Sequence, residues 1–129
     1  MFEMPQVMRD AQALARYAGA AQTQSAKNMA NADTPGYRAS ELQSFSEVMG
    51  GRSRDGVQMA RRHPAHLLGP REASFAVRNT SDPVDLNGNS VSIETEMVRA
   101  ARAQSQHTTA MTVYKASLDI MRTALGRGR

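Results

Sequence analysis

The chain has 129 residues, enough for one ordinary domain, but only 5 % of them are aromatic and Trp is absent, which excludes a large apolar core. It contains no Cys, which excludes disulfides and thiolate metal sites, and its apolar runs fall far short of the roughly 20 residues that cross a bilayer. The formal charge of +4 permits binding to an acidic surface without requiring it. At the N-terminus, Glu3, Pro5 and Asp10 stand where a secretory signal would need a basic stretch and an apolar run, so we expect no cleaved signal.

Spacings that alternate between four and three residues predict a first long helix. One face of it carries mostly small side chains, at Val7, Ala11, Leu14, Ala18, Ala21, Ser25 and Asn28. Pro5 suits the first helical turn, where its missing N–H is not needed. Small side chains bury little apolar area each, so this helix should depend on close packing with a partner.

The last third of the chain repeats the pattern with larger side chains. The stripe comprises Ile93, Met97, Ala100, Gln104, His107, Met111, Tyr114, Leu118, Met121 and Leu125. Ser92 is the expected N-cap, and Gly126 and Gly128 should end the helix. A polar position such as Gln104 or His107 can set register or partner choice. At about 1.5 Å per residue this helix is about 50 Å long, so it must extend outward or meet other chains.

Between these helices the chain is rich in Gly, Pro, Ser, Asn and Arg. We predict one short helical stretch there, opened by Ser40, closed by Gly50 and Gly51, and carrying Leu42, Phe45, Val48 and Met49. Extended segments or hairpin arms are expected at residues 74–77 and 90–93. The predicted fold is mainly α, with long N- and C-terminal helices paired as an antiparallel coiled coil around an irregular, partly extended middle. The predicted divisions are 1–37, 38–91 and 92–129.

The most specific local motif runs from Asn28 to Tyr37, where the first helix should end. Asn28 and Asn31 can bond backbone groups freed at the helix C-terminus, and Pro35-Gly36 fits the two central positions of a type II turn. Tyr37 can then pack back with its hydroxyl at the surface. A plain helix stop would explain this motif as well.

Taken with a second run, the motif resembles the flagellar basal-body rod and hook protein family. The family signature is Asn-x-Ala-Asn-x-x-Thr-x-Gly-Tyr, matched here by Asn28, Ala30, Asn31, Thr34, Gly36 and Tyr37, with Pro35 within it. Residues 87–97 resemble the run Asp-Gly-Asn-x-Val-Asp-x-x-x-Glu-Met that opens the C-terminal helix of proximal rod members. Asn87 and Ser92 depart from the acidic residues of that run.

The resemblance implies a structural subunit of the proximal rod, with no enzymatic activity. It implies export without a cleaved signal through the flagellar type III apparatus, a place in the basal body spanning the periplasm, and axial self-assembly that transmits torque. The implied partners are copies of the chain itself, other rod proteins, the basal adaptor protein and the export gate. The implied assembly motif comprises Asn28, Ala30, Asn31, Thr34, Pro35, Gly36 and Tyr37. The helix-packing residues are Val7, Leu14, Ala18, Ala21, Ile93, Met97, Ala100, Met111, Tyr114, Leu118, Met121 and Leu125.

Other readings remain open. Another axial rod component would share the motif, and Arg52, Arg54, Arg61 and Arg62 would suit a basic nucleic-acid-binding coiled coil, although we do not expect a nucleic-acid partner. A cytoplasmic helical adaptor or chaperone is a third alternative. His63 and His66 lie three apart around a Pro, without carboxylates nearby, so we predict no metal site. We also predict no catalytic residues, no cofactor and no small-molecule substrate, because no nucleophile stands at a suitable spacing from a base.

Overall fold

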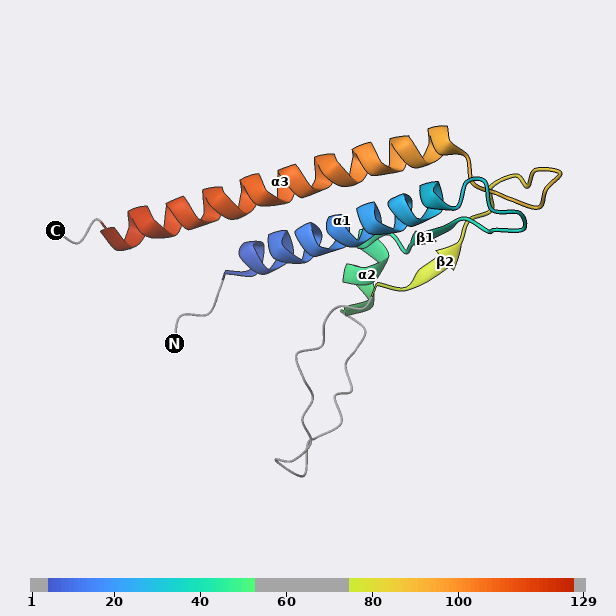
Figure 1. Cartoon of the computed structure of the whole chain (residues 1–129). Coiled ribbons are helices and arrows are strands. Elements are labelled where there is room, and N and C mark those ends of the chain that lie inside the picture. The colour runs from blue at the N-terminus through green and yellow to red at the C-terminus, as the bar shows by residue number, and fades with distance from the viewer. Residues whose placement is uncertain (1–4, 53–74, 127–129) are drawn as a thin grey trace, which may run out of the picture.

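The structure, a computed structural model, describes residues 5–52 and 75–126. Its elements are α1 (Gln6–Ala30), β1 (Ser40–Leu42), α2 (Phe45–Arg52), β2 (Val77–Asn79) and α3 (Ile93–Gly126). The helices α1 and α3 run side by side in opposite directions, and the small sheet with α2 lies along α1 (Figure 1). The predicted mainly helical fold, with paired terminal helices and an irregular middle, is confirmed.

Small side chains form the seam between α1 and α3. Ala11 and Ala18 of α1 are buried, as are Ala103 and Ala110 of α3. An alanine at each contact lets the two backbones approach closely, although it contributes little apolar area. The helix pair is therefore aligned by small residues and needs other contacts to hold it.

The predicted stripe of α1 matches the observed seam apart from its first member. Ala11 and Ala18 are buried and Leu14 and Ala21 are half-buried, whereas Val7 is 55 % exposed. Val7 therefore does not pack in the pair, because it lies at the first turn of α1. The bulk that the small stripe lacks comes from Met8 and Tyr17, which are buried beside it.

On α3 the observed seam is rotated from the predicted stripe. The fully buried positions Glu96, Ala103 and Ala110 repeat every seven residues, one position before Met97, Gln104 and Met111. Close helix approach selects the small side chains for the seam and leaves the larger ones to one side. Half-buried members of the predicted stripe are Ala100, His107, Tyr114, Leu118 and Met121. Exposed members are Ile93, Met97, Gln104, Met111 and Leu125. The exposed members do not pack against α1, and their contact with other chains stays a prediction.

The ends of the long helices follow the sequence signals with one shift. Ser92 caps α3, since its Oγ accepts a hydrogen bond from the Thr95 amide at 3.4 Å. α3 extends to Gly126, while Gly128 lies outside the described residues. Pro5 precedes α1 as its N-cap instead of lying in the first turn, and its carbonyl accepts from the Met8 amide at 3.0 Å.

The short middle helix begins later than predicted. α2 starts at Phe45 because Ser44 and Glu47 form a reciprocal capping box: the Ser44 amide donates to Glu47 Oε2 at 3.0 Å and the Glu47 amide to Ser44 Oγ at 3.4 Å. Ser40 therefore does not open a helix. Gly50 and Gly51 do not close it either, since α2 continues to Arg52.

Instead, Ser40 and Leu42 belong to β1, which pairs antiparallel with β2 in the register Ser40↔Asn79 and Leu42↔Val77. The predicted extended segment at 74–77 is thus shifted toward Val77–Asn79. The predicted segment at 90–93 ends where α3 begins at Ile93.

Aromatic contacts fasten this middle part to α1. The ring of Tyr17 lies 5.5 Å from the ring of Phe45 and 5.3 Å, edge to face, from the ring of Phe75. Burial raises the pKa of the Tyr17 hydroxyl, and the nearby Glu41 carboxylate raises it further. Tyr17 thus serves as the apolar anchor for α2 and β2.

Candidate assembly junction

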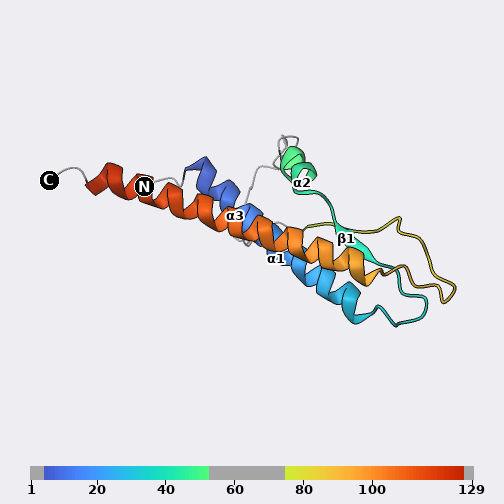
Figure 2. The same cartoon turned by 90° about the horizontal axis from the view of Figure 1, so that it is seen from above.

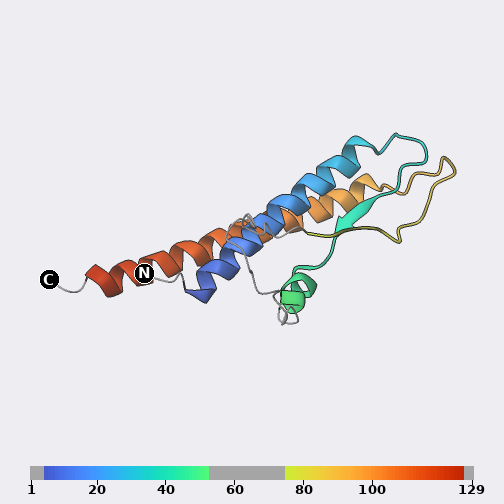
Figure 3. The same cartoon turned by 90° about the horizontal axis from the view of Figure 1, so that it is seen from below.

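The motif at the end of α1 and the run before α3 meet at one end of the molecule. Figures 2 and 3 show both loops at the same end, far from the C-terminal end of α3. We call residues 28–41 together with 80–99 the junction. Nearly all the buried polar side chains of the described residues lie in it: Asn28, Asn89, Ser90 and Glu96, with Ser25 one turn away.

The predicted type II turn is present at Pro35-Gly36. Gly36 has a φ of +72° and the Tyr37 amide donates to the Thr34 carbonyl at 3.3 Å. Gly36 then donates its own amide to the Asn87 carbonyl at 3.0 Å. Gly88, with a φ of +80°, lies so close that a Cβ there would stand 3.2 Å from Gly36 Cα. The two loops therefore touch backbone to backbone at two glycines.

Asn31 closes α1 as predicted. Its side-chain amide donates to the Lys27 carbonyl at 2.8 Å, which satisfies a carbonyl left free in the last turn. Its Oδ1 accepts from the Thr34 hydroxyl at 3.3 Å, so the helix end and the turn are connected.

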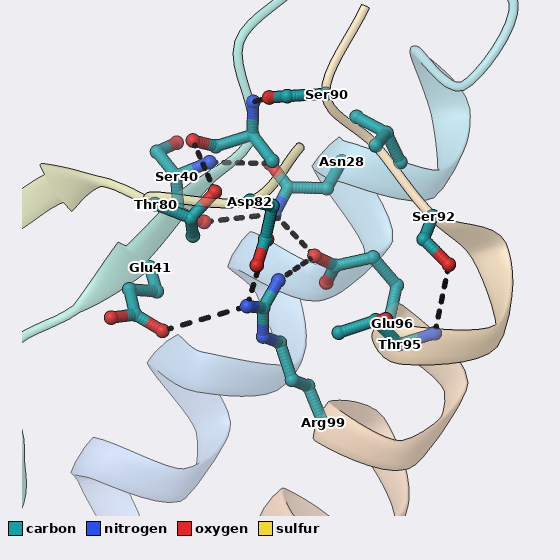
Figure 4. A network of polar contacts seen from close by, with 12 residues as sticks. Asn28, Ser40, Glu41, Thr80, Asp82, Ser90, Ser92, Thr95, Glu96 and Arg99 are labelled. Carbon is teal, nitrogen blue, oxygen red and sulfur yellow. Dashed lines mark hydrogen bonds and ion pairs between the residues drawn. The ribbon is translucent and has the colours of Figure 1, made fainter. Parts of the chain in front are cut away.

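Asn28, by contrast, does not cap its own helix. It is buried and its Nδ2 donates to the Ser40 carbonyl at 2.8 Å and to Glu96 Oε1 at 3.1 Å. Its Oδ1 accepts from the Ser40 amide and from the Tyr37 hydroxyl, both at 3.3 Å. One side chain thus connects α1, β1 and α3 (Figure 4). The Tyr37 hydroxyl donates to this buried side chain instead of lying at the surface as predicted.

Arg99 gathers the carboxylates of the junction. Its guanidinium donates to Glu96 Oε1 and, at 3.0 Å, to Asp82 Oδ2, with Glu41 at 3.8 Å (Figure 4). Partial burial by itself would raise the pKa of the Asp82 carboxyl. Hydrogen bonds from Thr80 and Arg99 together have the larger effect, so that this pKa is lowered. Glu96 is buried, so loss of Arg99 would leave its carboxylate as an uncompensated charge, and the network therefore favours one arrangement of the three segments.

Glu96 joins the helices a second time through its backbone. Its carbonyl accepts from the Ser25 hydroxyl at 2.8 Å, which sets the register of α1 on α3. Its second carboxylate oxygen, Oε2, is buried with no hydrogen-bond partner in the described part of the chain. Glu96 was not among the predicted site residues, because an acidic residue in a first helical turn is also typical of a plain helix dipole.

Asn89 is the other residue that sequence reasoning missed. Its Nδ2 lies 2.9 Å from the Asn31 carbonyl, 2.6 Å from that of Ala32 and 3.0 Å from that of Thr34. Its Oδ1 accepts from the Val91 amide at 2.7 Å. The side chain therefore satisfies the carbonyls of the motif loop from a position more than fifty residues further along the chain. The Asn-Gly-Asn turn was visible in the sequence, but nothing local indicated which backbone it would bind.

Two predicted motif residues lie apart from these contacts. Ala30 is exposed at the last position of α1, and Pro35 is exposed in the turn. The structure brings Asn28, Asn31 and Tyr37 together with the loop before α3 and with Glu96 in its first turn. The assembly role assigned to the motif stays a prediction.

The described residues offer little for metal or membrane chemistry. Within residues 5–52 and 75–126, no three His, Asp or Glu side chains gather closely enough to hold a metal ion. None of the helices in those ranges combines the length and apolarity of a membrane span. His63 and His66, where no metal site is predicted, lie outside the described residues, as do Arg54, Arg61 and Arg62.

The described residues thus form a two-helix hairpin, with a hydrogen-bonded junction at one end and exposed apolar residues along the longer helix. No family model matches the chain. It is 35 % identical over 88 residues to the flagellar basal body rod protein FlgB of Agrobacterium fabrum (strain C58 / ATCC 33970). That match covers 64 % of this chain and 64 % of the relative, so it spans just under two thirds of the relative's length. The predicted resemblance is confirmed: the chain resembles the flagellar basal-body rod proteins, and FlgB among them.

Proposed function

We propose that this chain is a structural, non-enzymatic subunit of the bacterial flagellar basal-body rod, which assembles through its terminal helices and transmits torque. The observation that carries the proposal is the junction. Residues of the rod-protein motif, Asn28 and Tyr37, lie in one hydrogen-bond network with Glu96 of α3. The similarity to FlgB supports the same assignment.

The exposed apolar side chains of α3 support assembly. Ile93 is 53 % exposed, Met97 61 % and Leu125 70 %, and all three lie outside the seam with α1. Met97, Met111 and Leu125 are exposed and follow one another at multiples of seven residues, a heptad spacing that is typical of contact with another helix. We assign this surface to neighbouring subunits, which would be copies of the chain and other rod proteins.

The network at the junction supports a mechanical role. A subunit can transmit torque only if its two helices keep their register. Buried polar groups oppose sliding of the helices, because leaving such a group without a hydrogen-bond partner costs free energy. Ser25 and Asn28 of α1 both bond to Glu96 of α3, so a shift of α1 along α3 would break both hydrogen bonds together. In this proposal the subunit lies in the basal body across the periplasm, is exported without a cleaved signal, and contacts the basal adaptor and the export gate.

Complementation of a deletion strain tests the function. Deletion should abolish motility, the wild-type chain should restore it, and the chain should co-purify with basal bodies. A motile deletion strain with intact basal bodies would overturn the proposal.

Two matched variants test the exposed stripe. Met97→Asp should block incorporation into basal bodies, because it places a carboxylate in the predicted contact. Val98→Asp is the control, since Val98 is 55 % exposed but points about 100° away around the helix. Circular dichroism should show that both variants remain as helical as the wild type. Equal incorporation of the two variants would contradict a role for the stripe.

A further inference from the structure

Asn87-Gly88 is the one Asn-Gly pair in the chain. An asparagine before a glycine is prone to deamidation, because a glycine without Cβ lets its backbone nitrogen reach the asparagine side chain. The other asparagines all precede a residue that has a side chain: Met29, Ala32, Thr80 and Ser90. Asn87 is also exposed, so water has access to it. The pair is therefore the asparagine site at which this chemistry meets least steric resistance.

The fold holds this pair in an unreactive conformation. The Gly88 amide donates to the Asp85 carbonyl at 2.9 Å, which closes a four-residue turn. Among the described residues only glycines have a positive φ, so the turn is type I and the ψ of Asn87 is about 0°. Ring closure needs the Gly88 nitrogen and the Asn87 Cβ on the same side of the Cα–C bond, which from this ψ takes a rotation of about 120°.

Other hydrogen bonds of the loop oppose that rotation. The Asn87 carbonyl accepts from the Gly36 amide at 3.0 Å, and the Asn87 Oδ1 accepts from the Asn89 amide at 2.9 Å. Turning the Asn87 peptide group moves its carbonyl away from Gly36 and its nitrogen partner away from Asp85. The reaction therefore requires the loop to open first.

We propose that Asn87 is a deamidation site, which the folded junction protects and which reacts when the chain is unfolded. The Gly88 nitrogen, after losing its proton to hydroxide, attacks Cγ of Asn87. The new N–Cγ bond closes a succinimide ring, the Cγ–Nδ2 bond breaks, and ammonia leaves. Water then opens the ring at Cγ to give aspartate, or at the backbone carbonyl to give isoaspartate. Overall one water is consumed and one ammonia is released, without oxidation or reduction.

The two products differ in whether the junction can form again. Aspartate keeps the backbone and an oxygen that accepts from Asn89. Isoaspartate routes the chain through the side-chain carbons, which adds a methylene to the backbone and turns the carbonyl that binds Gly36 into a free carboxylate. Gly88 already lies so close to Gly36 that a Cβ there would be 3.2 Å from Gly36 Cα, so the longer backbone has no room. Isoaspartate at position 87 thus marks chains that stayed unfolded and prevents their refolding, whether or not the chain is a rod subunit.

Deamidation rates of the full chain test the proposal. The purified protein is incubated in mildly alkaline buffer, with and without guanidinium chloride, and the fraction deamidated at Asn87 is measured by peptide mass mapping. The rate should be at least about tenfold higher in denaturant. Asn79, which precedes the β-branched Thr80, is the internal control and should react little in either condition.

A variant opens the junction without denaturant. Asn89→Asp leaves the Asn-Gly pair intact but removes the side-chain amide that binds the carbonyls of the facing loop. In buffer it should raise the rate at Asn87 at least about tenfold over the wild type. An unchanged rate in this variant, or equal wild-type rates with and without denaturant, would show that the fold does not protect Asn87. No reaction at Asn87 in denaturant would rule out the modification site itself.

Refolding tests the difference between the products. Protein deamidated in denaturant is returned to buffer, and the folded fraction is isolated by gel filtration and mapped again. Aspartate at position 87 should be present in the folded fraction, and isoaspartate should be depleted from it at least about tenfold. Isoaspartate at this position in equal proportion in the folded and unfolded fractions would overturn the argument from the close contact of the two glycines.

Discussion

Replacing Asn89 with Asp preserves the shape of the side chain and removes its donor. In the structure the Asn89 amide donates toward the carbonyls of Asn31, Ala32 and Thr34, at 2.9, 2.6 and 3.0 Å, and the side chain is buried. A carboxylate would face the same carbonyls with an acceptor. The Val91 amide, which binds Oδ1, is the contact that the substitution retains.

The expected loss follows from these bonds. The two N–H groups are each worth about 1 kcal/mol net, and the Ala32 carbonyl, which loses its donor, costs about 1–3 kcal/mol more. The carbonyls of Asn31 and Thr34 keep the backbone amides of Thr34 and Tyr37 as donors. Asn89→Asp should therefore lower the free energy of unfolding by about 3–5 kcal/mol, out of the 5–15 kcal/mol or so that is typical of a domain. A protonated carboxyl can donate one hydrogen bond, so the gap between variant and wild type should narrow in acid.

Urea unfolding followed by far-UV circular dichroism measures this loss. Asn79→Asp is the matched control, because it makes the same chemical change at an exposed position of β2. Surface substitutions of this kind usually stay within about 0.5 kcal/mol of the wild type. An Asn89→Asp variant as stable as Asn79→Asp would refute the role given to the Asn89 amide.

Three further predictions concern the same junction. Gly88→Ala should lower the free energy of unfolding by about 2–3 kcal/mol, and Gly36→Ala should lower it by about 1 kcal/mol. Both glycines have a positive φ, but only a Cβ at Gly88 would meet backbone, at 3.2 Å from Gly36 Cα. Equal falls in the thermal midpoint of the two variants would contradict this. Asn87→Asp should change the free energy of unfolding by no more than about 0.5 kcal/mol. The Asn87 Oδ1 accepts a hydrogen bond from the Asn89 amide at 2.9 Å, and a carboxylate oxygen can accept the same bond. A loss above about 1 kcal/mol in urea unfolding would count against this prediction. The lowered pKa of Asp82 means that its contribution to stability is present above the ordinary carboxyl value of about 3.9 and is lost as the pH falls through the lower folded value. Asp82→Asn should flatten that acid limb in unfolding measured across pH, and an unchanged limb would argue against the Arg99 contact.

Features encoded by neighbouring residues could be predicted from the sequence. The turn at Pro35-Gly36 and the cap at Ser92 were correct, because each depends on a few adjacent side chains and backbone groups. The predicted N-cap of the short middle helix, Ser40, was wrong, because local signals did not distinguish it from Ser44. Ser40 and Ser44 both fit a capping box, since Gln43 and Glu47 stand three residues after them, but in the structure Ser40 pairs in β1 and Ser44 forms the box with Glu47.

Long-range partners could not be predicted in the same way. Asn28 was expected to cap its own helix, yet it binds Ser40 and Glu96, because folding buries it between three segments where those groups offer better geometry. The approach of Glu41 and Asp82 to Arg99 likewise has no trace in local spacing, although Glu96 and Arg99 are an i,i+3 pair within α3. Such networks depend on which loops meet in space.

By itself, the sequence determined that the chain has two long helices with heptad periodicity and a turn at the end of the first, because helix period and turn chemistry are local. Only the tertiary structure decided which face of α3 meets α1. Close approach selected Ala103 and Ala110 and left Met97 and Leu125 outside. The tertiary structure also decided that the motif loop and the start of α3 form one network, since the partners of Asn28 and Asn89 are brought to them only by the fold.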